Sequence, residues 1–348
     1  MTRAVAIAHA AAVSAFGVGA TGLGHALAEG AVLRGIPPEA PLANSRARKM
    51  MSRAAYLAAR CLGDLVRELG WADGREQIGY FLGVGASGGS LDELMALLDE
   101  SLVDGAFSLE RFGTRGLAAC NPLLAFQLMN NFTLCHGAIL EGLGGPNSAV
   151  FSRGAGTVAA LAEAVHAVRS GDCERAIAGG ADAPTHPATI AELAREGLVA
   201  RGLVAADAAA LLALVPCPLP DHAATLVEGC AIASGRARSV IEAVDEAVDR
   251  TGIDRLAQVE VVVIAPWGPP ASDALRSWVA ARFPAATVVS TAALGESLAA
   301  SAALAVIAGM DLIADPERSG HGGPRRALVL TLGVDGDPGA VVLSRGAA

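Results

Sequence analysis

The segment GPNSAVFSRGAG, residues 145–156, has the pattern of a strand–turn–helix unit that carries a catalytic nucleophile. A short apolar strand enters a turn of small residues, and apolar residues at helical spacing follow as far as residue 170. Such a turn exposes the side chain at its apex, and the start of the helix favours an anion there. The apex residue is Gly154, which carries no heteroatom. The segment therefore predicts a nucleophile elbow without a nucleophile.

Neighbouring residues offer other chemistry. Ser152 could be a substitute nucleophile, but no histidine has the pattern of a partnered base, which favours a hydrogen-bonding role. Arg153 could meet a carboxylate or phosphate, or could pair with a buried acid such as Glu296. Cys135 and His136 are adjacent, but helix neighbours point about 100° apart, so we expect no thiol–imidazole pair.

Composition limits the class of protein. The chain has 348 residues, of which 53% are hydrophobic, so two domains or one duplicated domain are expected. A net charge of −9 argues against general nucleic-acid binding. The six cysteines show no metal-binding spacing, and no apolar run has the length and flanks of a membrane span. We expect buried free thiols in a cytoplasmic protein without metal or cofactor.

Short apolar strands alternate with helices along the chain, which predicts a largely parallel α/β architecture. The chain divides into two similar series of elements, taken as residues 1–200 and 201–348. Strands are expected at 4–8, 78–85, 148–151, 175–181, 209–216, 259–266, 286–291, 326–332 and 340–344. Helices are expected at 50–69, 90–100, 121–140, 156–170, 222–234, 237–251, 271–283 and 296–313.

From the elbow outward, the chain resembles the β-ketoacyl synthases of the thiolase-like superfamily. The most specific match is AEAVHAVRSGDCERAIAGGADA (162–183), and IGYFLGVGASGG (78–89) and NPLLAFQLMNNFTLCHGAILEGLGGPN (121–147) are also similar. The resemblance implies a thiolase-like, five-layered αβαβα fold with two pseudo-duplicated halves. It also implies a reaction in which an acyl chain on a cysteine condenses with malonyl-carrier protein.

The family's catalytic residues are missing from the matching positions. Its cysteine falls on Gly154, its first histidine near Trp267, its second on Glu296, and its lysine near Ala292 or Ala293. Tryptophan cannot act as a base near neutral pH, and glutamate would place negative charge where a developing enolate needs stabilisation. These replacements leave no condensation mechanism, so the resemblance implies a pseudoenzyme.

The chain is similar to the chain-length factors of type II polyketide synthases, which keep the fold, lose the cysteine and heterodimerise with a working ketosynthase. This implies a ketosynthase homologue and an acyl carrier protein as partners, in polyketide or fatty-acid-like biosynthesis. The strand at 147–151 would pair with the partner, and the segment at 120–132 would help to shape its acyl tunnel. The residues expected at these surfaces are Cys120, Leu123, Leu124, Phe126, Ser148, Val150 and Phe151.

A basic run, SRARKMMSR, stands out on the acidic chain and contains the only lysine. Arg46, Arg48, Lys49 and Arg53 could form a docking patch for an anionic acyl carrier protein, or simply a solvated helix start. Two other functions stay open. The chain could be a homodimeric scaffold that binds acyl carrier protein or acyl-CoA, or a divergent acyltransferase or hydrolase that uses Ser152.

Overall fold

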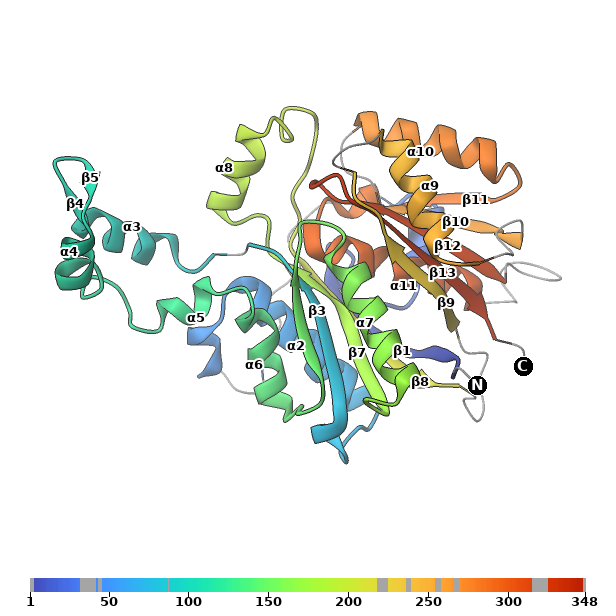
Figure 1. Cartoon of the computed structure of the whole chain (residues 1–348), viewed down its shortest axis with the longest axis horizontal. Coiled ribbons are helices and arrows are strands. Elements are labelled where there is room, and N and C mark those ends of the chain that lie inside the picture. The colour runs from blue at the N-terminus through green and yellow to red at the C-terminus, as the bar shows by residue number, and fades with distance from the viewer. Residues whose placement is uncertain are drawn as a thin grey trace.

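The computed structural model describes residues 3–31, 42, 46–86, 88–217, 225–235, 239–253, 258–265, 269–314 and 325–346. Within these residues, an eleven-stranded mixed sheet forms the centre of the molecule, and helices pack against it (Figure 1). A separate two-stranded hairpin lies in an arm that extends away from the body of the molecule in Figure 1.

The sheet contains the same strand order twice. In each half, three parallel strands are followed by two antiparallel ones, and β1 pairs with β9 at the junction of the halves. The first half is β6 (Asn147–Phe151), β3 (Ile78–Val84), β7 (Arg175–Asp182), β8 (Ala208–Pro216) and β1 (Val5–Ser14). The second half is β11 (Thr287–Ser290), β10 (Val261–Ala265), β12 (Arg326–Leu332), β13 (Pro338–Arg345) and β9 (Thr225–Ile232). The eleventh strand, β2 (Gly17–Val18), is antiparallel to the end of β1. The expected boundary at residues 200 and 201 precedes β8, whereas this repeated order groups β8 with the first half.

Helices and sheet halves stack as five layers. Alternate residues of the strands face opposite sides, as the strand geometry requires, and both sides are buried. The inner faces of both halves pack on α7 (Gly156–Ser170) and α11 (Ser301–Ala314). The outer face of the first half packs on α2 (Arg53–Glu68) and α6 (Phe132–Glu141), and that of the second on α9 (Val240–Arg250) and α10 (Pro269–Arg282).

Two predicted helices differ from the structure. The segment 222–234 was expected to be helical, but residues 225–232 form β9, in which buried Thr225, Val227 and Gly229 alternate with more exposed residues. Gly229 has to be small because a Cβ there would lie 2.5 Å from the carbonyl oxygen of Thr251. The expected helix at 121–140 is interrupted, since α5 (Leu124–Leu128) ends before α6 begins at Phe132.

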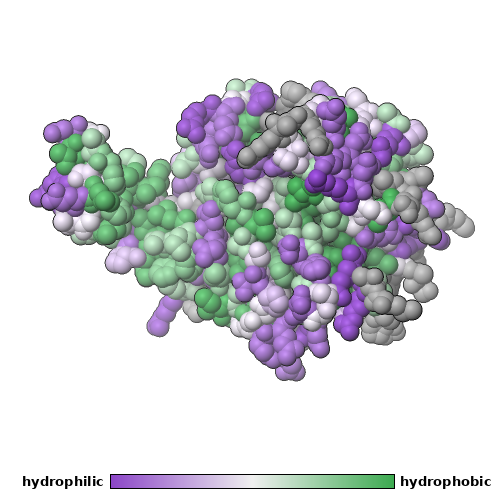
Figure 2. Space-filling view, viewed as in Figure 1, coloured by the Kyte–Doolittle hydropathy of each residue, from purple (hydrophilic) through white to green (hydrophobic). Residues whose placement is uncertain are grey.

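The arm consists of residues 91–117 and exposes many apolar side chains. Its hairpin turns at Asp104 and Gly105, whose φ values of 50° and 80° fit the Asp-Gly type I′ turn. Figure 2 shows apolar surface on the arm and on the neighbouring part of the body. Its elements are α3 (Leu91–Glu100), β4 (Leu102–Val103), β5 (Ala106–Phe107), α4 (Leu109–Arg111) and a π-helix (Phe112–Gly116). The exposed apolar residues are Met95, Leu98, Leu102, Val103, Phe107, Leu109 and Leu117.

The cysteines form no disulfide bonds. Cys61 and Cys173 are buried, as expected, whereas Cys120, Cys135, Cys217 and Cys230 are only partly buried. None of the helices in the described ranges combines the length and the apolar character needed to cross a membrane.

Candidate functional site

The elbow connects β6 to α7 at the centre of the first half. The Ser152 amide donates to the Val84 carbonyl over 3.2 Å, which holds the chain beside the end of β3. Gly83 of β3 lets α7 begin close to the sheet, because a Cβ at Gly83 would lie 2.5 Å from the Thr157 nitrogen. The Thr157 hydroxyl donates to the Ala299 carbonyl of the second half. Packing and hydrogen bonds therefore fix the geometry of the elbow.

The apex of the elbow is in backbone contact with the opposite half. A Cβ built on Gly154 would lie 2.0 Å from the Cα atom of Gly333, and one built on Gly333 would lie 2.5 Å from the Cα atom of Gly154. Gly333 directly follows β12 and begins the loop 333–337 that leads to β13. Since no real Cβ atom tolerates such distances, no side chain fits at Gly154 unless this loop moves.

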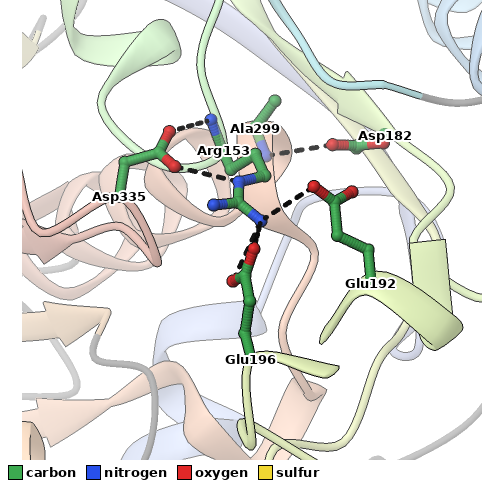
Figure 3. A network of polar contacts seen from close by, with 6 residues as sticks. All are labelled: Arg153, Asp182, Glu192, Glu196, Ala299 and Asp335. Atoms are coloured by element: carbon green, nitrogen blue, oxygen red, sulfur yellow. Dashed lines mark hydrogen bonds and ion pairs between the residues drawn. The ribbon is translucent and has the colours of Figure 1, made fainter. Parts of the chain in front are cut away.

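Arg153 connects the elbow to this loop through a cluster of carboxylates (Figure 3). Its backbone N–H and its Nε donate to the two carboxylate oxygens of Asp335, over 3.0 and 2.9 Å. Its Nη1 donates to Glu196 over 3.0 Å and lies 3.7 Å from Glu192, at the end of α8 (Pro187–Arg195). Arg153 thus pairs with these three acids, not with Glu296, and holds the loop 333–337 against the elbow.

Two acids with raised pKa values lie behind the elbow. Asp182, at the end of β7, is fully buried and accepts from the amides of Ala183 and Ala299 over 2.8 and 3.5 Å. Burial raises the pKa of Asp182 to about 7, and the charge of Asp207 adds to this rise. Burial also raises the pKa of the partly buried Glu296 to about 7, and the charge of Asp182 raises it further. Negative charge is therefore disfavoured here.

Glu296 is held by its own turn. Its Oε1 accepts from the Leu298 amide over 2.7 Å and from the Ser301 hydroxyl over 2.6 Å. Its backbone bridges to the chain at 204–206, where its amide donates to the Val204 carbonyl over 2.7 Å. Glu296 thus fixes the start of α11, which is a structural role.

Another buried carboxylate, that of Asp207, is paired with Arg53. Asp207 has no exposed surface, accepts from the amide and hydroxyl of Thr185, and forms an ion pair with Arg53. Arg53, which was expected in the basic docking patch, is therefore held by an internal acid. Arg46, Arg48 and Lys49 are exposed. Among the described residues, no group of three His, Cys, Asp or Glu side chains could hold a metal ion.

Two of the family's catalytic positions remain to be located. Ala292 is exposed in the 3-10 turn Thr291–Leu294, and Trp267 lies outside the described residues. Ser152 lines a pocket of about 420 Å³. Its other lining residues are Ala86, Phe151, Arg153, Glu192, Asp335 and Asp337.

No histidine of the described part of the chain is bonded to Ser152. The ring of His9 bonds to Glu68, that of His136 to the Met50 carbonyl, and that of His186 to the Gly89 carbonyl and the Ala188 amide. These rings stabilise local structure. The pocket beside Ser152 therefore offers carboxylates and one arginine, but no partnered base of the kind a serine nucleophile uses.

The predicted partner surface lies at one end of the sheet. β6 pairs with β3 on one edge, and no strand of the described chain pairs with its other edge. Phe151 is 56% exposed, Ile139 on the adjacent α6 is 73% exposed, and Ser148 and Val150 are partly buried. The edge strand thus presents both backbone groups and apolar side chains.

The predicted tunnel residues have mixed positions. Leu123 is 37% exposed and Cys120 is partly buried. Phe126 is partly buried and packs edge-on against Phe132, with ring centroids 4.7 Å apart. Leu124 is only 2% exposed and packs beside Gly89, so it belongs to the core of this chain.

The residues that close the elbow were not predicted. Asp335 lies 182 residues after Arg153, and Glu196 lies 43 residues after it, so no local spacing connects them. The sequence does carry one relevant signal, the motif GVDGDPGA at 333–340, where Gly333 and Asp335 occur together. Asp182 ends the Gly-Gly-Ala strand, but its burial follows only from the packing of both halves.

Several solved structures have the same fold. A chain of the AntDE:AntF complex, a type II PKS acyl-carrier protein with its ketosynthase, matches with a TM-score of 0.77, 10% identity, and 99% and 100% coverage of the two chains. The ishigamide ketosynthase/chain length factor matches with a TM-score of 0.77, 18% identity and full coverage of both chains. A β-ketoacyl synthase from Burkholderia phymatum STM815 matches with a TM-score of 0.74, 17% identity and full coverage. At these identities, the likeness establishes the thiolase-like ketosynthase fold.

Sequence comparison identifies the family. No curated protein sequence matches the chain. The family model described as "Beta-ketoacyl synthase, N-terminal domain" matches residues 13–213, which is more than half of the chain. With its duplicated five-layered fold and its elbow between β6 and α7, the chain therefore belongs to the β-ketoacyl synthase family.

Proposed function

We propose that this chain is a non-catalytic subunit of the chain-length-factor type, which heterodimerises with an active ketosynthase in type II polyketide or fatty-acid-like biosynthesis. The observation that carries the proposal is the contact between Gly154 and Gly333. Acyl transfer in this family needs a thiolate at the elbow, and here the position has no heteroatom and no space for one.

The electrostatics of the elbow support the same conclusion. Condensation builds negative charge on an enolate, which needs nearby hydrogen-bond donors or positive charge. Glu296 and Asp182 instead lie behind the elbow, and the guanidinium of Arg153 is bound by three carboxylates. The site therefore opposes the chemistry that it would have to perform.

The partner surface is the open edge of β6 together with the arm. Unpaired edge strands readily pair with another chain, and large exposed apolar patches mark interaction sites. Phe151 and Ile139 lie near the edge, and the arm adds Phe107 and Leu109, which are 56% and 76% exposed. The structural neighbours named as a ketosynthase/chain length factor and as a ketosynthase with its carrier protein support a partner of this class.

The exposed basic side chains support docking of an acyl carrier protein. Arg46, Arg48 and Lys49 lie in or beside the 3-10 helix Ala47–Met50, here called the basic turn, on a chain of net charge −9. An anionic carrier protein would be attracted to this patch, and the attraction would weaken with added salt. Replacing all three residues by alanine is expected to weaken carrier binding at low salt and to flatten its salt dependence.

Co-expression tests the proposal. The chain is produced together with a cysteine-bearing β-ketoacyl synthase, and the complex is analysed by native mass spectrometry. We expect a one-to-one heterodimer, in which an acyl-thioester analogue labels only the ketosynthase cysteine. A stable homodimer that ignores the ketosynthase would contradict the proposal and favour a scaffold that binds acyl carrier protein or acyl-CoA.

The same labelling experiment addresses Ser152. Acyl transfer to this chain that disappears in Ser152→Ala would contradict the proposal and identify an acyltransferase or hydrolase. Ser170→Ala provides a matched control, because the Ser170 hydroxyl bonds only locally, to the carbonyls of His166 and Ala167 and to Asp172. Label that survives both replacements would place the acyl group elsewhere on the chain and would equally contradict the proposal.

A further inference from the structure

The basic turn is held by two side chains from the segment that includes α5 and α6. Gln127 on α5 (Leu124–Leu128) donates from Nε2 to the Lys49 carbonyl over 2.9 Å. His136 on α6 approaches the Met50 carbonyl with Nε2 at 3.0 Å, and because a carbonyl only accepts, this nitrogen carries the proton. Terminal helix carbonyls lack partners within the helix, so these contacts fix the end of the turn.

The same Gln127 side chain also holds the root of the arm. Its Oε1 accepts from the Ser90 amide over 3.1 Å. Ser90 is the N-cap of α3, where its hydroxyl accepts from the Glu93 amide over 3.4 Å. Gly89 allows this approach, since a Cβ there would lie 2.9 Å from the Cβ atom of Gln127. One amide group therefore bridges the first helix of the arm and the basic turn.

Contacts within the turn orient its charged side chains. The Arg48 guanidinium carbon lies 4.7 Å from the ring centroid of Tyr56, which is 4% exposed on α2. Cation–π contact over a buried ring limits the directions that Arg48 can take. The Met51 amide donates to the Arg48 carbonyl over 3.1 Å and closes the turn. A shift of the turn would therefore redirect its charges.

We propose that Gln127 is a positioning residue that links the basic turn to the arm, so that binding of the ketosynthase partner orders the surface on which the carrier protein docks. The inference rests on the proposed function. Binding that rigidifies one surface lowers the entropic cost of a second binding event at a connected surface, which makes the two events cooperative.

Hydrogen exchange tests this link without carrier protein. The amide exchange of residues 47–51 is measured by mass spectrometry in the isolated chain and in its complex with the ketosynthase. In the wild-type chain we expect exchange to slow by about fivefold or more on complex formation. In Gln127→Met, which removes both hydrogen bonds and keeps the length of the side chain, we expect the complex to form while this slowing is lost.

Two further variants test whether the slowing of exchange depends on the hydrogen bond from Gln127 to Lys49 or is lost with any hydrogen bond. Gln127→Glu keeps an acceptor for the Ser90 amide and removes the donor to Lys49, so it should lose the slowing as well. Gln258→Met, which removes a distant bond between Gln258 and Arg326, should retain it. Carrier binding, measured by fluorescence anisotropy with a type II holo acyl carrier protein, should weaken about fivefold in both Gln127 variants.

The outcomes are distinct. If the ketosynthase binds but exchange in the wild-type turn does not change, or slows equally in Gln127→Met, the inference is overturned and the proposed function stands. If both Gln127 variants lose partner affinity by more than tenfold, Gln127 is an interface residue and the inference is likewise overturned. If the wild-type chain binds no ketosynthase, the proposed function itself fails.

Discussion

The elbow and the arm differ in how their residues are contacted. Contacts within the chain surround the elbow, whereas large apolar side chains on the arm are exposed. At the elbow, Gly154 touches Gly333 backbone to backbone, and Arg153 is surrounded by carboxylates. On the arm, Phe107 and Leu109 are exposed, although both are large apolar side chains. A protein that acted alone on a substrate would have an open centre and a polar surface. This chain has a closed centre and an apolar extension, and large exposed apolar patches mark interaction sites, which supports the partner proposed above.

The two regions also differ in how they are built. The arm is held together by contacts between residues that are close in sequence. The Ser101 hydroxyl donates to the Leu97 carbonyl, and a Cβ at Gly116 would lie 2.2 Å from the Ser101 hydroxyl oxygen. The closed elbow combines residues from β6, α8 and the loop after β12. Disturbing the arm should therefore alter assembly, whereas disturbing the elbow should alter global stability.

The largest effect is expected from Gly154→Cys. The new side chain collides with Gly333, so the free energy of unfolding should fall by about 3 kcal/mol, and condensation should still not occur. Denaturant unfolding measures the change. Gly113→Cys is the control, because a Cβ at Gly113 meets nothing within 4 Å, and it should cost less than about 0.5 kcal/mol. A fully stable Gly154→Cys protein would show that the elbow is not closed.

Phe151→Asp should weaken heterodimer formation by about 2 kcal/mol or more, roughly thirtyfold, and leave the isolated chain stable. The reason is that Phe151 ends the open edge strand and is 56% exposed in the isolated chain. Val288→Asp is a matched control on β11, the edge strand at the other end of the sheet, where Val288 is 37% exposed. Native mass spectrometry measures heterodimer formation in both variants. If both lose the same affinity, β6 is not part of the partner surface.

Stability should fall as the pH rises from about 4 to about 7. The pKa values of Asp182 and Glu296 are raised to about 7 by burial, so the folded chain keeps protons that the unfolded chain releases in this range. Below this range both states are protonated, and above it both are ionised, so the loss levels off. We expect the free energy of unfolding to be lower at pH 8 than at pH 5, and most of the loss from this pair to occur between pH 5 and pH 7.

Two variants check the origin of this pH dependence. Asp182→Asn replaces the buried acid by an uncharged group of the same shape and should reduce the difference between pH 5 and pH 8. Asp104→Asn, on the exposed hairpin turn, should leave it unchanged. The same pH profile in Asp182→Asn as in the wild-type chain would mean that other groups cause the dependence.

Arg153→Met should give the smallest change, about 1 kcal/mol of stability, because the acids around Arg153 are partly solvated, with Glu196 32% and Asp335 31% exposed. Thermal unfolding of this variant is compared with that of Arg282→Met, which breaks a more exposed pair with Asp245 and should cost less. If Arg153→Met leaves the unfolding temperature unchanged, the contact between Gly154 and Gly333 alone closes the elbow.

The sequence predicted the fold well where apolar runs were long. The expected strand at 326–332 and helix at 156–170 have these same bounds in β12 and α7. β9 was mistaken for a helix because its alternation uses Thr, Gly and Ala, whose small side chains hide the difference between inward and outward positions. Strand order and the junction between β1 and β9 are long-range pairings, and local patterns carry no information about them.

The site was predictable only in part. Local spacing placed Gly154 at the apex of a strand–turn–helix unit, and the structure has this unit between β6 and α7. The contact with Gly333 and the ion pair with Asp335 join segments about half the chain apart, so no spacing rule could give them. Arg53 was assigned to the surface from its position in a basic run, whereas the buried Asp207 binds it.

The backbone contact between Gly154 and Gly333 also has an evolutionary consequence. A descendant that regained cysteine at the elbow would lose stability before it gained any chemistry, since the facing loop would have to move in the same step. A side chain at either glycine would collide with the backbone of the other, so a return to cysteine requires several simultaneous mutations. The contact thus stabilises the nucleophile-free form of the elbow against single substitutions at either glycine.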